Sequence, residues 1–164
     1  MDPQLVDAMI ESLRVPRDLL FDFFVGFSRF EYALKAAGFT KDPPADADAS
    51  WEKFEGWLEK LRDSEVAPVL LAGHYLLNDP PKKLVILNGD PQWQVPGRQG
   101  QSEVRFLVDS LRRARNNLFH GGKWLTAPEP PDRNELVIST GVRVLSALID
   151  LPSACDLRRH FGEL

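Results

Sequence analysis

Residues 102–123 have the sequence SEVRFLVDSLRRARNNLFHGGK, which predicts a helix followed by two glycines that can end it. The apolar side chains of this segment recur at helical spacing and form one stripe, made of Val104, Leu107, Val108 and Leu111. At about 3.6 residues per turn, Arg115 falls near the middle of that stripe, and His120 lies roughly 140° around the helix from it. An arginine on an apolar face is costly unless an anion meets it. This conflict is the main functional signal of the chain.

The composition indicates one globular domain that covers residues 1–164. Hydrophobic residues make up 43% of the chain and charged residues 27%, which is typical of a folded protein rather than a disordered one. No apolar run reaches the roughly 18 residues of a membrane span, and the acidic start of the chain is unlike a signal peptide. The single cysteine, Cys155, excludes an internal disulfide and offers no metal cluster. We therefore expect a soluble cytoplasmic protein without a metal or cofactor, and with no membrane partner.

Almost every periodic segment predicts a helix. The expected helices cover the first residues to about Leu13, Arg17–Ala37, a segment capped by Ser50, Glu65–Leu77, Ser102–Phe119, Asp132–Leu151 and a short last helix that Ser153 could cap and that ends near His160. In the second of these helices, the spacing of the apolar residues indicates a core face, made of Leu20, Phe23, Phe24, Phe27, Phe30 and Leu34. Residues 78–100 predict a long loop, in which the apolar residues 84–87 could form a brief strand or simply cover the core. The sequence thus predicts an all-α bundle of four to five main helices, with a long loop before the helix of residues 102–119.

Charge is distributed unevenly along the chain. The net charge is −4, which argues against a protein built to coat nucleic acid. Between residues 101 and 124, however, two acidic residues stand against five basic ones, which are Arg105, Arg112, Arg113, Arg115 and Lys123. A local basic patch suits a small polyanion or a short piece of RNA better than a long duplex. A solvated helix face is the alternative that needs no ligand.

Residues 115–120, RNNLFH, resemble the signature of HEPN domains, in which four residues separate an arginine from a histidine and an asparagine often follows the arginine. Residues 27–35, FSRFEYALK, also resemble an early helix of many HEPN proteins. The resemblance implies a HEPN-like helical bundle that often dimerises and brings two motifs to a shared cleft. Many HEPN proteins are metal-independent endoribonucleases, and many belong to toxin–antitoxin or antiviral systems. Others bind nucleotides or are non-catalytic scaffolds, so the fold alone does not settle the activity.

Ribonuclease chemistry needs few groups, because RNA carries its own nucleophile in the 2′-hydroxyl. A histidine titrates near neutral pH, so His120 is expected to transfer protons. Arg115 would stabilise the charge of the transition state, and Asn116 would orient the imidazole or bind the phosphate. Arg112, Arg113 and Lys123 are the expected RNA-binding residues. The predicted hydrolase is a homodimer with RNA as its substrate and an antitoxin protein as a further partner, and it leaves a 2′,3′-cyclic phosphate without a metal.

Two alternatives remain open at the level of sequence. On a straight helix Arg115 and His120 point to different sides, so either the helix unwinds at Gly121 and Gly122 or a second protomer completes the site; we favour the second protomer. Arg115 could instead bury its stem and pair with Glu31, while His120 caps carbonyls at the helix end. The alternative function is a non-catalytic HEPN-like module that binds a protein partner or a nucleotide, in which Arg115 would serve that contact.

Overall fold

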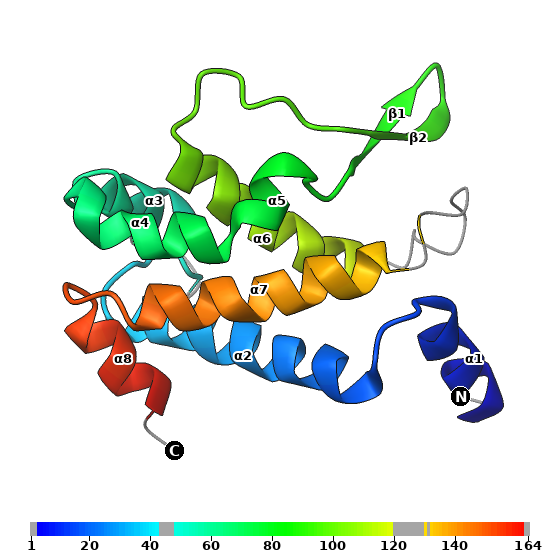
Figure 1. The fold of residues 1–164 in the computed structure, drawn as a ribbon, viewed down its shortest axis with the longest axis horizontal. Coiled ribbons are helices and arrows are strands. Elements are labelled where there is room, and N and C mark those ends of the chain that lie inside the picture. The colour runs from blue at the N-terminus through cyan, green and yellow to red at the C-terminus, as the bar shows by residue number, and fades with distance from the viewer. Residues whose placement is uncertain (1–2, 43–47, 120–129, 131, 163–164) are drawn as a thin grey trace.

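The computed structural model describes residues 3–42, 48–119, 130 and 132–162. The described chain is mostly helical, which confirms the prediction of a largely all-α fold (Figure 1). Its helices are α1 (Pro3–Ser12), α2 (Arg17–Ala36), α3 (Trp51–Leu58), α4 (Asp63–Ala72), α5 (His74–Asn78), α6 (Glu103–Phe119), α7 (Arg133–Ile149) and α8 (Cys155–Gly162). Two strands, β1 (Lys83–Leu87) and β2 (Asp90–Gln94), form a hairpin inside the segment that was predicted to be a loop. Within these residues, no helix combines the length and the low polarity needed to cross a bilayer.

Helices α2, α6 and α7 enclose the core. Helix α7 packs against α2 on one side and against α4, α5 and α6 on the other, while α3 packs on α6 and α8 on α2 (Figure 1). The predicted core face of α2 is buried at Phe23, Phe27, Phe30 and Leu34. Phe24 is a correction, because its side chain is 46% exposed. Neighbouring residues of a helix lie about 100° apart, which turns Phe24 away from the face that Phe23 shares with residues 27, 30 and 34.

The helix predicted for residues 65–77 is two helices, α4 and α5, which meet at Gly73. A Cβ atom at Gly73 would lie 2.4 Å from both Cδ atoms of Leu107 on α6. Real side chains do not approach so closely, so only glycine lets α6 come this near to the backbone. The break redirects the chain, so that α5 runs on across α6 and α7.

A buried ion pair fixes the end of α5 against the start of α7. The guanidinium of Arg133, which is buried, donates from Nε and Nη2 to the two carboxylate oxygens of Asp79 at 3.0 and 3.1 Å. Arg133 Nη2 also donates to the carbonyl of Pro80 at 3.0 Å, and the Tyr75 hydroxyl donates to Asp79 at 2.8 Å. Burial pushes the pKa of Asp79 upward, but the hydrogen bonds from Arg133 and Tyr75 outweigh it and hold the pKa below its ordinary value.

The apolar residues 84–87 belong to strand β1 of the hairpin. Strands β1 and β2 are antiparallel, and the pair Leu87 and Asp90 closes a two-residue turn. Asn88 and Gly89 fill this turn with φ angles of 52° and 90°. Positive φ at both positions is typical of a type I′ turn, whose twist matches that of the two strands. The hairpin projects from the helical body (Figure 1).

The two predicted serine caps have different outcomes. Ser50 caps α3, since its hydroxyl accepts a hydrogen bond from the backbone N–H of Lys53 at 3.4 Å. Ser153 does not cap α8, which begins only at Cys155. Its hydroxyl donates instead to Glu65 at 2.6 Å and so connects the start of α8 with α4. Ala154 holds the N-cap position, since its carbonyl accepts the first helical hydrogen bond from Arg158 N–H, so Ser153 lies one residue too early to cap α8.

Gly141 provides a test of core packing. A Cβ atom there would lie 2.6 Å from Cε2 of the buried Phe23. We expect Gly141→Ala to lower the free energy of unfolding, because overpacking costs about 1–3 kcal/mol, whereas alanine gains at most about 1 kcal/mol over glycine in a helix. Gly56→Ala in α3 is the matched control, because its Cβ would meet no atom within 4 Å. Chemical denaturation measures both, and equal stability of the two variants would contradict the packing described here.

The Asp79–Arg133 pair predicts a pH dependence of stability. A carboxyl group whose pKa is lowered by folding stabilises the fold above its unfolded pKa, and this contribution is lost as the pH falls through the folded pKa. We expect Asp79→Asn to cost about 1–2 kcal/mol at neutral pH, a value reduced because the Asp79 side chain is half exposed. The difference from the parent protein should shrink below about pH 4. Denaturation midpoints measured from neutral to acidic pH test this, and a difference that stays constant would contradict it.

Candidate nucleic-acid interface

Helix α6 has one buried side and one side that faces solvent. The predicted apolar stripe is confirmed, since Val104, Leu107, Val108 and Leu111 are all buried. Arg115 follows this stripe by one turn, but its side chain stays 34% exposed. The partly exposed side of the same helix carries Arg112, Arg113 and Asn116. The basic residues of α6 therefore differ in their surroundings.

Arg115 lies over α2. Its guanidinium carbon is 5.7 Å from the centroid of the Phe27 ring, and Nη2 is 3.9 Å from a carboxylate oxygen of Glu31. Nη1 donates to the side-chain oxygen of Asn116 at 3.2 Å. Arg115 therefore already has a carboxylate partner within the chain. This pairing with Glu31 is the alternative that the sequence left open. The structure also brings together two of the three predicted catalytic residues, Arg115 and Asn116.

The third predicted catalytic residue, His120, lies outside the described residues, and so does Lys123, a predicted RNA-binding residue. Helix α6 is described up to Phe119, which directly precedes His120. The structure therefore describes residues 115–119 of the motif.

Arg112 takes part in the contact between α3 and α6. Its Nη1 lies 3.6 Å from Glu55 and 3.4 Å from Asp109, and its guanidinium carbon lies 5.1 Å from the centre of the Trp51 ring system. Glu55 is buried, and Arg105 donates to it from Nε at 3.1 Å. Burial raises the pKa of Glu55, and nearby Asp109 adds to this, while Arg105 and Arg112 oppose it. Arg105 and Arg112 thus compensate the buried carboxylate in part, while Oε1 of Glu55 has no hydrogen-bond partner among the described residues, so this part of the basic patch has a structural role.

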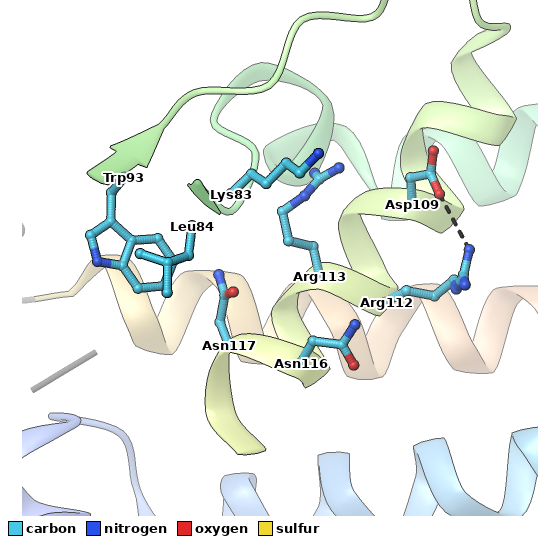
Figure 2. Close-up of a pocket in the computed structure, with 8 residues that line it drawn as sticks. All are labelled: Lys83, Leu84, Trp93, Asp109, Arg112, Arg113, Asn116 and Asn117. Atoms are coloured by element: carbon cyan, nitrogen blue, oxygen red, sulfur yellow. Dashed lines mark hydrogen bonds and ion pairs between the residues drawn. The ribbon is translucent and has the colours of Figure 1, made fainter. Parts of the chain in front are cut away.

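A groove of about 480 Å³ lies between the hairpin and α6 (Figure 2). Its lining residues come from β1, β2 and residues 109–117 of α6, and they are Lys83, Leu84, Trp93, Asp109, Arg112, Arg113, Asn116 and Asn117. We call this the hairpin groove. Three of these side chains are cationic and one is a carboxylate, so the groove is net positive although the whole chain is acidic. The structure thus brings the predicted residues Arg112, Arg113 and Asn116 to one surface.

Arg113 is the least compensated cation of the groove. Its Nη1 is buried and has no hydrogen-bond partner within the described residues. Burial lowers the pKa of Arg113 below the ordinary arginine value; Asp109 opposes this change and Arg112 adds to it. An arginine remains charged in proteins all the same, so a partly desolvated positive charge stands in the wall of the groove.

Asn117 holds the hairpin over α6. Its side-chain amide donates to the backbone carbonyl of Lys82 at 2.9 Å, directly before strand β1 begins. Across the hairpin, Leu84 pairs with Trp93, and both line the groove. Neither Lys83 nor Trp93 is among the site residues predicted from the sequence. The Asn-Gly pair at residues 88–89 was the signal that could have found the hairpin and with it both residues.

The described residues contain no group of three histidine, cysteine, aspartate or glutamate side chains that could hold a metal ion. Comparison of the chain with models of protein families, with curated proteins and with solved structures finds no match. The resemblance to HEPN domains therefore rests on residues 27–35 and 115–120.

Neighbouring asparagines provide a matched test of how the groove is built. We expect Asn117→Ala to speed amide hydrogen exchange in residues 83–94 about fivefold, because it removes a hydrogen bond of roughly 1 kcal/mol to the base of the hairpin. Asn116→Ala should leave this exchange unchanged, since Asn116 is exposed and contacts Arg115. Mass spectrometry of exchanged peptides gives the measurement. Equal protection of the hairpin in the two variants would show that Asn117 does not anchor it.

Proposed function

We propose that this chain is a metal-independent endoribonuclease with a HEPN-like fold. One observation carries the proposal: the last two turns of α6 present Arg113 and Asn116 to a net-positive groove, and Asn116 also contacts Arg115. The chain continues from there directly into His120. An amide, two guanidinium groups and an imidazole are suitable groups to bind a phosphodiester and to move protons at it.

In the proposed reaction, the 2′-oxygen of RNA attacks the adjacent phosphorus while the bond from phosphorus to the 5′-oxygen breaks. The 2′-hydroxyl loses a proton and the departing 5′-oxygen gains one, and His120 serves one of these transfers. Arg115 balances the charge that develops on the nonbridging oxygens, with Asn116 holding its guanidinium. The products are a 2′,3′-cyclic phosphate and a 5′-hydroxyl, and no metal takes part.

The proposal includes a homodimer. Apolar side chains on α2 are exposed next to the motif helix, with Phe21 65% exposed and Phe24 46%. Both line an apolar depression of about 400 Å³ that also includes Leu118, two residues before His120. Exposed apolar surface of this kind favours contact with another protein surface. A symmetric contact here would bring two motifs near each other, and an antitoxin partner in a defence system is a further implication of the resemblance.

A second candidate is a non-catalytic HEPN-like module that binds a protein partner or a nucleotide. The contact between Arg115 and Glu31 favours it, because a carboxylate of the same chain already faces the motif arginine. In this case Arg115 stabilises the packing of α6 on α2, and the hairpin groove holds a ligand without cleaving it.

The decisive experiment is cleavage of mixed RNA by the purified chain in the presence of EDTA. We expect cleavage to products with a 2′,3′-cyclic phosphate, and we expect His120→Ala to reduce the rate by about two to four orders of magnitude, the typical contribution of a general acid or base. Arg115→Ala should reduce it similarly. Circular dichroism should show unchanged helix content in both variants.

Mixing the two inactive variants then tests the shared cleft. If each site uses Arg115 of one protomer and His120 of the other, the mixture regains part of the activity. A strict requirement for magnesium, or full activity of His120→Ala, would refute the nuclease. Loss of helical signal in both variants would favour the non-catalytic module.

A further inference from the structure

The hairpin groove contains a charge that nothing in the described chain fully compensates. Nη1 of Arg113 is buried without a hydrogen-bond partner among the described residues, although a buried guanidinium nitrogen is costly to leave unpaired. The other arginines of α6 have carboxylate partners, which are Glu55 and Glu59 for Arg105, Glu55 and Asp109 for Arg112, and Glu31 for Arg115. Arg112 and Arg113 both line the groove together with Lys83, but only Arg113 lacks a described carboxylate partner among the arginines of α6. An anion in the groove would offset this partly buried charge by electrostatic attraction, without direct contact with the enclosed Nη1.

The hairpin side of the groove carries Lys83 together with an apolar and an aromatic side chain. Trp93 on β2 is half-buried and is paired across the hairpin with Leu84 (Figure 2). Asn116 on α6 is exposed and adds an amide that can both donate and accept hydrogen bonds. A flat aromatic ring opposite cations is a typical arrangement for a nucleotide, because the base stacks on the ring while the phosphate meets the cations.

The groove suits one nucleotide of a single strand rather than a duplex. About 480 Å³ is within the range of small-ligand sites, roughly 300–1,000 Å³, so the groove suits one nucleotide. In duplex RNA the bases are stacked and paired, and only a single strand can turn a base onto a protein side chain.

We propose that the hairpin groove binds one nucleotide of single-stranded RNA, with its phosphate at Arg113 and Lys83 and its base on Trp93. The inference rests on the proposed function for its choice of RNA. It adds the substrate class, and it assigns Lys83 and Trp93 as RNA-binding residues. The groove lining includes Asn116 and Asn117 of the motif, and Asn116 also contacts Arg115.

The test uses the full chain with His120→Ala, so that bound RNA stays intact, and a fluorescein-labelled single-stranded oligouridylate whose anisotropy is followed at several salt concentrations. Arg113→Gln should weaken binding about tenfold and reduce the salt dependence of log K by about 0.7, the value for one phosphate of a single strand. Trp93→Ala should weaken binding by about five- to a hundredfold without changing the salt dependence, and Trp93→Phe should restore most of the affinity. A duplex of the same length should bind at least about tenfold more weakly.

Arg62→Gln is the matched control for charge, because Arg62 is exposed and lies outside the groove. It should leave both affinity and salt dependence unchanged. The inference is overturned if Arg113→Gln or Trp93→Ala binds like the parent, if Arg62→Gln weakens binding as much as Arg113→Gln, if the duplex binds as tightly as the single strand, or if the parent does not bind. Groove-dependent binding without any cleavage by the unsubstituted chain would refute the nuclease alone, whereas cleavage with unchanged binding by the groove variants would refute the groove alone.

Discussion

The insertion of Leu107 into the space beside Gly73 is the contact on which the geometry of the groove depends. It brings α6 close to the backbone and divides what would be one helix into α4 and α5. Helix α5 then ends at Asp79, which Arg133 fixes against α7, and the buried prolines 80 and 81 follow. From this fixed point the chain has only one short step to β1. The groove is therefore a consequence of how the core packs, and not of an independent loop.

The arginines of α6 differ in whether a carboxylate of the fold compensates their charge. Arg105 and Arg112 face Glu55, whose carboxylate is buried and would otherwise be unpaired. These contacts join α3 to α6 and pair two of the four arginines of α6 with Glu55 of α3. Arg113 lies in the wall of the hairpin groove with Asp109 nearby, and it takes part in none of the ion pairs described above. Its charge is consequently available to a ligand, while that of its neighbours supports the fold.

The sequence predicts the helices of this protein well, because apolar residues at helical spacing report directly on the buried face. The stripe of α6 and the boundaries of α2 and α7 agree with the prediction to within two residues. Phe24 was misplaced because spacing alone does not show where an apolar face ends. The break at Gly73 depends on Leu107, which is far away in sequence, and no local pattern could reveal it. The hairpin lies where the sequence predicts a loop, although Asn88 and Gly89 are a typical pair for its turn.

The candidate site was predictable only in part, for a related reason. The spacing of α6 identified Arg112, Arg113, Arg115 and Asn116 as one group, but it could not tell which arginines already have partners in the fold. That distinction comes from Glu31 and Glu55, which belong to other helices. Likewise, Lys83 and Trp93 join the site only because Asn117 draws the hairpin over α6. Contacts between distant segments decide which residues of a motif are free to act.

A lone pair of strands is at best marginally stable in water, so the hairpin owes its order to the helix that it rests on. Asn117 anchors its base through the carbonyl of Lys82, while the residues of its turn are exposed. Mutations along the ribbon can therefore accumulate at little cost to the helical core. Changes in the length or the sequence of the hairpin can therefore alter ligand preference, while the helical scaffold that forms the rest of the site stays the same.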